Sequence, residues 1–152
     1  MVKSLPVRSA VPVEETWDLS SLISSSPDFN QQLEDIEQQA EALNKNFQGT
    51  IMDTKTITLV LTAYMTFMEK MVLLSTHANL TASTDQTNDE AQLQASKFGT
   101  TAAKIGSQLS FITSELLALP TETLEQAMEQ STEFRIFLKN YFVKTLSITS
   151  RS

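Results

Sequence analysis

The sequence predicts an all-α protein, an antiparallel helical bundle built on a long two-helix hairpin with an extended amino-terminal arm. The 152 residues include only 3 Gly and 4 Pro, and tight turns depend on these residues. Apolar residues recur every three or four positions along most of the chain, which is the period of an α-helix. With 41% hydrophobic residues, a chain of this length can bury a core as one domain.

The first 26 residues form the predicted arm. Pro6 and Pro12 lack a backbone donor and disfavour helix in the residue before them. Trp17, the chain's single Trp, is expected to press onto the helical body. We expect the helical domain to span residues 27–144. Residues 145–152 are expected to form an unstructured, truncated tail, because nothing after Lys144 continues the helical pattern.

The first helix is predicted to start near Ser26-Pro27, because a capping hydroxyl followed by Pro at the first helical position is a helix start signal. Gly49 is a natural stop. The apolar positions form a narrow seam on a rod rich in Gln and Glu: Phe29, Leu33, Ile36, Ala40, Leu43 and Phe47. One face of this helix should therefore pack, while the rest meets water.

The second helix should run from Asp53-Thr54 to about Leu80. It carries two adjacent apolar rows, which predict a central place in the bundle: Ile57, Leu61, Tyr64, Met68 and Met71 in one, and Val60, Phe67 and Leu74 in the other. The stretch from Ile57 to Leu80 is the most apolar, but Thr, Glu, Lys and His interrupt it. A membrane span needs about 20 mostly apolar residues, so we expect none.

The third helix is expected to open on a capping box, Thr87-x-x-Glu90, and to end at Pro120. The small residues Ala95, Gly99 and Ala102 should allow close approach of a neighbouring helix. Its seam has unbroken spacings of three and four: Ala95, Phe98, Ala102, Ile105, Leu109, Ile112, Leu116 and Leu119. A short helix over Thr121 to Gln130 and a last helix capped by Ser131 follow, the latter with the apolar face Phe134, Phe137, Leu138 and Tyr141.

The charge and the absence of cysteine narrow the function classes. The net charge of −7, with scattered Lys and Arg, argues against nucleic-acid binding, which needs clustered positive charge. No Cys is present, and the first twenty residues hold no apolar segment typical of a signal peptide. Both observations favour a cytoplasmic protein.

The residues offer no catalytic machinery, so we predict no catalytic, cofactor-binding or metal residue. A hydrolytic zinc site needs three His, Cys or carboxylate ligands, whereas the chain has one His and no H-E-x-x-H. We interpret His77 as structural or partly exposed; alternatively it helps to hold the connector beside it. Glu34 and Glu41 are interpreted as a solvated face. Four methionines of the second helix suit either plain core or an adaptable binding groove: Met52, Met65, Met68 and Met71.

Five elements occur in a fixed order along the sequence, beginning at Arg8, Phe47, His77, Phe111 and Phe134. Together they resemble the oligoendopeptidase F family of zinc peptidases. The first is Arg8-x-x-x-Pro12-x-x-x-Thr16-Trp17-Asp18-Leu19, and the second is Phe47-Gln48-Gly49-Thr50 after the first helix. The others are His77-Ala78-x-Leu80 with Asp85-x-Thr87-Asn88, then Phe111 through Leu124 with Glu115-Leu116-Leu117, and last Phe134-x-x-Phe137-Leu138. Each element is weak alone, but their order and spacing over residues 5–142 make the resemblance specific.

The resemblance implies an all-helical zinc endopeptidase that cuts short peptides inside a large cavity, with amino-terminal helices forming part of the wall. The catalytic region of the family lies later in its chain, so the resemblance assigns no catalytic or metal residue here, and this chain alone should be inactive. The Lys144-Thr145-Leu146-Ser147 ending departs from the family pattern. We therefore expect a truncated piece, whose exposed apolar face meets the missing catalytic lobe or a second copy. The rival hypothesis is a stand-alone helical interaction module.

Overall fold

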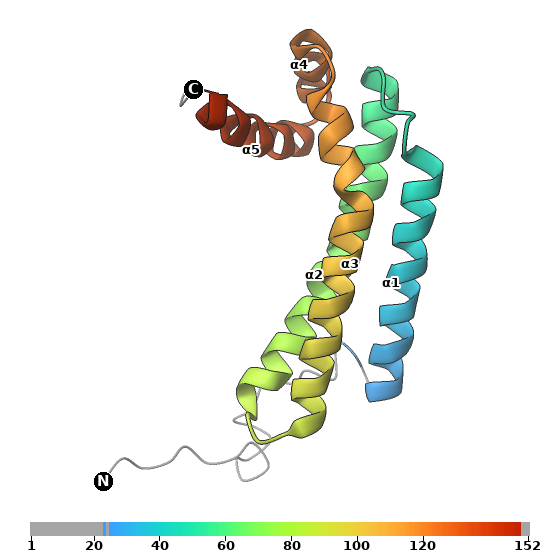
Figure 1. Ribbon diagram of the computed structural model, residues 1–152, viewed down its shortest axis with the longest axis vertical. Helices are drawn as coiled ribbons and strands as arrows, with labels where there is room; N and C mark the ends of the chain where they lie inside the picture. Colours follow the sequence, from blue (N-terminus) through green and yellow to red (C-terminus); the bar gives the residue numbers. More distant parts are fainter. Residues whose placement is uncertain (1–22, 24, 150–152) are drawn as a thin grey trace, which may run out of the picture. The chain divides into compact units, whose positions relative to one another are not determined.

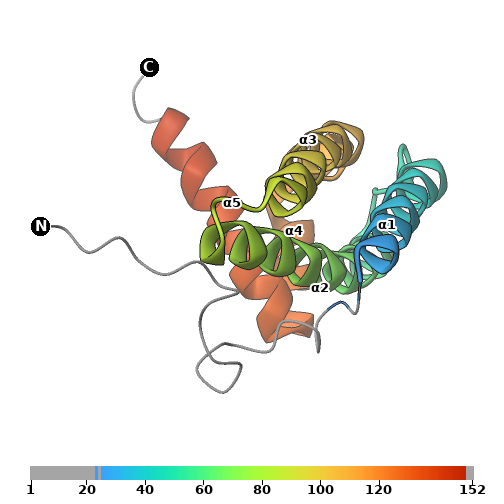
Figure 2. The same cartoon turned by 90° about the horizontal axis from the view of Figure 1, so that it is seen from below.

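The computed structural model describes residue 23 and residues 25–149, with side chains through Asn140. Within these residues the chain forms five α-helices and no strand: α1 (Ser26–Phe47), α2 (Thr54–Thr84), α3 (Asp89–Leu117), α4 (Thr121–Gln130) and α5 (Thr132–Thr149) (Figure 1). The all-α prediction is confirmed, and α2 and α3 form the predicted hairpin, whose connector faces the viewer in Figure 2. The predicted arm falls outside the described residues except for residues 23, 25 and 26, and Trp17 falls outside them altogether.

The helices group into two compact units, and each of the three long helices contributes to both. The first unit comprises Met1–Gln39 and Phe67–Gly106, which include the start of α1 and the closed end of the hairpin. The second comprises Ala40–Thr66 and Ser107–Ser152, which include α4 and α5.

The first unit buries the predicted seams of α1 and α3 against α2. Phe29, Leu33 and Ile36 of α1 are buried, as are Phe98 and Ile105 of α3. The facing side of α2 adds further buried residues: Phe67, Leu74, Ala78 and Ala82. The predicted wide apolar stripe of α2 is therefore partly confirmed here, although Met68 and Met71 are only half-buried.

The second unit packs the other ends of the same helices with α4 and α5. Its core holds Ile57, Val60 and Leu61 of α2, with Phe134 and Leu138 of α5. Two hydrogen bonds tie α2 to α4, from Thr54 Oγ1 to Gln126 Oε1 at 3.3 Å and from Thr58 Oγ1 to Gln130 Oε1 at 2.7 Å. Tyr64 of α2 meets Phe137 of α5 edge to face, with ring centroids 5.6 Å apart. Such edge contacts are a favoured aromatic geometry.

Polar contacts show that α1 and α3 run in the same direction. In the first unit, Gln94 Nε2 donates to Ser26 Oγ at 2.7 Å, and Thr101 Oγ1 donates to Glu37 Oε1 at 3.1 Å. In the second unit, Asn44 Nδ2 donates to the carbonyl oxygen of Gln108 at 2.7 Å. The hydrogen-bonded residues occur in the same order along α1 and α3, so these two helices are parallel. The hairpin makes α2 antiparallel to both.

One ion pair also joins α1 to α3. Lys104 Nζ lies 3.0 Å from Glu37 Oε2. The ammonium of Lys104, and then the hydroxyl of Thr101, holds the pKa of Glu37 below its ordinary value. Both side chains are substantially exposed, so the pair contributes little to stability.

Helix starts differ from the sequence prediction by one residue at α1 and by one at α3. Ser25, rather than Ser26, caps α1, because its Oγ accepts a hydrogen bond from the amide of Asp28 at 3.3 Å. Asn88 caps α3, because its Oδ1 accepts from the amide of Ala91 at 3.1 Å. The predicted box at Thr87 is wrong: its hydroxyl donates to Asp85 Oδ1 instead.

The ends of the last two helices are mostly as predicted. The short helix spans Thr121–Gln130, and Ser131 Oγ accepts from the amide of Glu133 at 3.2 Å, which confirms Ser131 as a cap. However, α5 continues to Thr149, past the predicted end at Lys144. No Gly or Pro stands between Thr132 and Thr149, so nothing in the backbone chemistry interrupts the helix. The domain limits at 26, 144 and 152 remain predictions.

By length and composition, α2 is apolar enough to cross a membrane, with a mean hydropathy of 1.5 over its most apolar 18 residues. Two of the threonines that argued against a span form hydrogen bonds within the helix, since the hydroxyls of Thr62 and Thr66 each donate to the carbonyl four residues earlier. Core helices of soluble proteins share this composition, and α2 contributes buried residues to both units. The absence of a membrane span stays a prediction.

Candidate functional site

His77 is the chain's only histidine, and it lies in the packing of the first unit. Its side chain on α2 is 9% exposed, and its ring centroid lies 5.8 Å from that of Phe29 on α1. Its carbonyl oxygen accepts a hydrogen bond from Thr81 Oγ1 at 2.8 Å. This placement favours the structural interpretation of His77. Among the described residues, no group of three or more His, Cys, Asp or Glu side chains is close enough to hold a metal ion.

The other side chains singled out from the sequence do not come together as a binding or catalytic site among the described residues. Glu34 and Glu41 are exposed on α1, as predicted for a solvated face. Met52 is 67% exposed, so the plain-core interpretation is wrong for it. Met65, Met68 and Met71 are half-buried. These methionines line neither of the two hollows described below.

In the second unit, a carboxylate holds the connector between α1 and α2. Glu115 of α3 accepts two backbone hydrogen bonds, from Gly49 at 2.6 Å and from Ile51 at 3.3 Å. Gly49 has a φ of 78°, the left-handed conformation in which Gly closes a helix. Ile51 is buried, with 6% of its surface exposed. The contact joins the Phe47-Gln48-Gly49-Thr50 and Glu115-Leu116-Leu117 elements, which the sequence analysis singled out separately.

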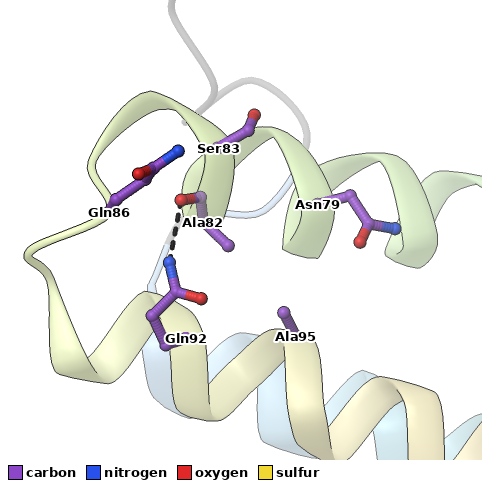
Figure 3. A pocket seen from close by; sticks show the side chains of 6 residues that line it. All are labelled: Asn79, Ala82, Ser83, Gln86, Gln92 and Ala95. Atoms are coloured by element: carbon purple, nitrogen blue, oxygen red, sulfur yellow. Dashed lines mark hydrogen bonds between the residues drawn. The ribbon is translucent and has the colours of Figure 1, made fainter.

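A groove of about 600 Å³ lies at the closed end of the hairpin (Figure 3). Its lining is uncharged: Asn79, Ala82 and Ser83 of α2, Gln86 of the connector, and Gln92 and Ala95 of α3. Ala82 and Ala95 leave the space between the helices because their side chains are short. Gln92 Nε2 crosses it to the carbonyl oxygen of Ala82 at 2.9 Å. Because none of the described lining residues is charged or titratable, they can offer hydrogen bonds but no acid or base.

A second pocket, of about 190 Å³, lies at the starts of α1 and α3 in the same unit. Its lining is polar and includes one carboxylate: Ile23, Ser25, Ser26, His77, Thr81, Asn88, Glu90, Ala91 and Gln94. Two of these polar side chains are at least nine-tenths buried, His77 with 9% and Gln94 with 7% of the surface exposed. None of the polar residues that line the groove is buried to this extent.

Several large apolar side chains are exposed. In the first unit these are Val72, Leu73 and Leu93, and in the second unit Met52, Leu59, Leu117 and Ile136. Scattered exposed apolar residues are normal on a protein surface. However, five of them expose more than half of their surface, Val72 and Leu93 in the first unit and Met52, Leu59 and Ile136 in the second, so each unit offers apolar side chains that a partner could bury.

Neither Gln94 nor the role of Glu115 was predicted from the sequence. The sequence does carry a signal for Gln94, because polar residues recur every seven positions beside the apolar seam of α3, at Gln94, Thr101 and Gln108. Each forms a hydrogen bond with α1, Gln94 and Thr101 through the side chain and Gln108 through its backbone carbonyl. The predicted close approach at Gly99 is wrong, because a Cβ added there would meet nothing within 4 Å. Its side faces open space rather than a neighbouring helix.

The chain is 25% identical to oligopeptidase PepF of Bacillus subtilis (strain 168) over 134 residues. The match covers 88% of this chain but 20% of the relative, so the chain spans about a fifth of the length of the curated protein that it matches. No protein-family model matches the chain. No solved structure matches it either. The resemblance inferred from the five ordered elements is thus confirmed as a distant similarity to one part of PepF.

Proposed function

We propose that this chain is a non-catalytic amino-terminal domain of an oligoendopeptidase F-like zinc metalloendopeptidase and forms part of the wall of its substrate cavity. The similarity to PepF over 88% of the chain carries the proposal. Proteolysis of short peptides and dependence on zinc are what the resemblance implies for the full-length family. They would reside outside this chain.

The contact between Gly49 and Glu115 supports this proposal. The resemblance rests partly on the Phe47-Gln48-Gly49-Thr50 and Glu115-Leu116-Leu117 elements, which lie far apart in the sequence. In the structure these elements bond to each other at 2.6 Å through a glycine in the left-handed conformation. A structural contact of this kind constrains both elements together, which gives a physical reason for their joint occurrence.

The exposed apolar residues supply the proposed partner surface. A domain that lines a cavity in a larger enzyme must contact the remaining lobe, and the exposed Met52, Leu59 and Ile136 of the second unit suit such a contact. Without that lobe, the same residues should drive self-association. Leu59→Glu and Ile136→Glu should each weaken it in sedimentation velocity measured at several concentrations, whereas a wild-type chain that stays monomeric throughout would contradict this part of the proposal.

A domain exchange tests the proposal directly. The segment of PepF that matches this chain is replaced by this chain, and cleavage of a short fluorogenic peptide and of a folded protein is measured. The expected chimera folds and cleaves the peptide in a chelator-sensitive manner but spares the folded protein. A well-folded chimera that cleaves the folded protein would show that the chain does not restrict the cavity.

The isolated chain provides the complementary test. It should be helical by circular dichroism yet leave short peptides intact with added zinc. Measured zinc-dependent turnover that a chelator abolishes would overturn the non-catalytic assignment. The cytoplasmic location and the absence of nucleic-acid and membrane partners belong to the same proposal.

A stand-alone helical interaction module remains the second candidate, and the exposed glycines of α3 favour it. Gly99 and Gly106 lie inside a helix, where each destabilises the chain relative to Ala. A Cβ at either position would meet nothing within 4 Å, so packing within the chain does not require them. A partner helix that approaches α3 closely would. If Gly99→Gln weakens self-association and Leu59→Glu does not, the module hypothesis is favoured over the missing-lobe surface.

A further inference from the structure

Ile23 is the first described residue of the chain, and it is anchored on α2 in the first unit. Only 3% of its surface is exposed. It lines the same small pocket as His77 and Thr81 of α2. The residues immediately before Ile23 are therefore tethered close to the surface of this helix.

An incompletely covered apolar strip of α2, formed by Leu73 and Leu80, lies beside this anchor. Leu73, His77 and Leu80 are spaced by four and three positions, which places them on one face of the helix. His77 is buried, whereas Leu73 exposes 39% of its surface and Leu80 is half-buried. Because removing apolar surface from water is favourable, this strip suits an apolar occupant.

The sequence before Ile23 supplies such an occupant within reach. Trp17, the largest apolar side chain of this stretch, stands six positions before Ile23. An extended chain spans at most about 3.6 Å per residue, so Trp17 can lie up to about 20 Å from Ile23. Leu73 stands eight positions before Thr81, which is about 12 Å along the helix axis at 1.5 Å per residue. The whole strip is thus within the reach of Trp17.

We propose that the indole of Trp17 docks on the apolar strip of α2, against Leu73 and Leu80. An indole offers a large apolar area to a shallow surface, and its N–H group tolerates contact with water at the edge of that surface. The tether through Ile23 makes the contact intramolecular, and a short linker supplies an effective concentration in the millimolar range. A strip of two leucines can therefore hold the ring. The inference concerns the first unit alone and does not rest on the proposed peptidase role.

The fluorescence of the whole chain tests this proposal, because Trp17 is the chain's single Trp and no other indole contributes to the signal. Acrylamide should quench Trp17 several-fold less in the folded chain than in the urea-unfolded chain. The protection should be the same at every protein concentration, since the contact is intramolecular. Quenching equal to that of the unfolded chain would overturn the docking, and protection that disappears on dilution would assign Trp17 to a second copy instead.

Leu73→Asp and Val72→Asp form a matched pair of variants. The two residues are consecutive and both exposed on α2, but they point about 100° apart around the helix axis, so only Leu73 belongs to the strip. Leu73→Asp should raise the quenching of Trp17 about twofold or more, because the indole would have to desolvate a carboxylate. Val72→Asp should leave the quenching unchanged. Equal quenching in the two variants would overturn the assignment of the strip.

Trp17→Ala gives the reciprocal readout, which does not depend on how a Leu73 variant folds. The ring current of an indole shifts the proton NMR signals of groups that it contacts. Removal of the ring should therefore move the methyl signals of Leu73 and Leu80. The methyl signals of Leu138, buried in the second unit, should stay in place. Leu73 and Leu80 signals that do not move would overturn the proposal.

Discussion

The carboxylate of Glu115 accepts a hydrogen bond from the backbone amide of Gly49 at 2.6 Å and thereby fixes the end of α1 on α3. The second oxygen of the same carboxylate accepts from the amide of Ile51 at 3.3 Å. The amide of a glycine that closes a helix ordinarily bonds back to a helix carbonyl, but here the amides of Gly49 and Ile51 bond to Glu115 instead. A single side chain of α3 therefore satisfies the connector, and the connector in turn sets where α2 begins.

Replacing Glu115 by Ala should destabilise the chain by about 1–2 kcal/mol, because two amides, one of them the amide of the buried Ile51, lose a charged acceptor. Glu115→Gln should cost less, since its remaining carbonyl oxygen can still accept one bond. Urea unfolding followed by circular dichroism measures both. Glu125→Ala, an exposed change on α4, is the control and should stay within about 0.5 kcal/mol of wild type. Equal stabilities of the Glu115 and Glu125 variants would show that the hydrogen bonds of Glu115 to the connector contribute nothing to stability.

Gly49→Ala should destabilise the chain by about 1 kcal/mol through the backbone alone. Its φ of 78° lies in the left-handed region that a side chain disfavours. A Cβ would meet nothing within 4 Å, so no clash adds to the cost. The same unfolding experiment measures the change. An unaltered midpoint would mean that the connector takes up another conformation without loss.

Gly99→Ala and Gly106→Ala should have the opposite sign and stabilise the chain by about 0.5–1 kcal/mol each. Both residues lie within α3, both are exposed, and an added methyl group finds open space at each. Thermal unfolding at low protein concentration measures the monomer's stability. A destabilised Gly99→Ala chain would reveal a contact at this face that the chain alone does not show.

The helices could be predicted from the sequence because their apolar period is unbroken and their stops are chemically explicit. Gly49 ends α1 and the Thr121–Gln130 helix follows Pro120, as predicted. Five of the six seam residues of α1 are buried, and Phe47 is half-buried. Apolar residues spaced by three and four positions all lie on one face of a helix, and only that face can be buried. The pattern therefore leaves few alternative structures for this segment.

The pocket and the contact of Glu115 with the α1–α2 connector could not be predicted, because both depend on residues brought together from distant parts of the chain. Glu115 and Gly49 are 66 positions apart, and Gln94 and Ser26 are 68 apart. A polar residue beside an apolar seam is ordinary in sequence, and only the parallel arrangement of α1 and α3 gives Gln94 and Thr101 their partners. Helix caps also eluded the pattern, since Thr87 and Asn88 are both good capping residues and the structure selects Asn88.

A reciprocal capping interaction, of the kind predicted at Thr87, is found instead at the start of α2, and its strength should depend on pH. Asp53 Oδ1 accepts from the amide of Thr56 at 2.8 Å, and the amide of Asp53 donates to Thr56 Oγ1 at 3.0 Å. The amide of Thr56, and then its hydroxyl, holds the pKa of Asp53 below its ordinary value of 3.8. The unfolded chain therefore binds more protons than the folded chain near this pH.

It follows that the cap's contribution is complete above pH 3.8 and is lost as the pH falls through the lower pKa of the folded state. Thr56→Ala removes the hydroxyl but keeps the amide, so the pKa of Asp53 should rise while it remains below 3.8. Carboxyl carbon NMR across an acid titration measures this pKa. Thr58→Ala is the control, because Thr58 bonds to Thr54 and Gln130 instead. An Asp53 titration that is identical in both variants would show that the hydroxyl of Thr56 does not stabilise the charged carboxylate, and the cap would then act through the amide alone.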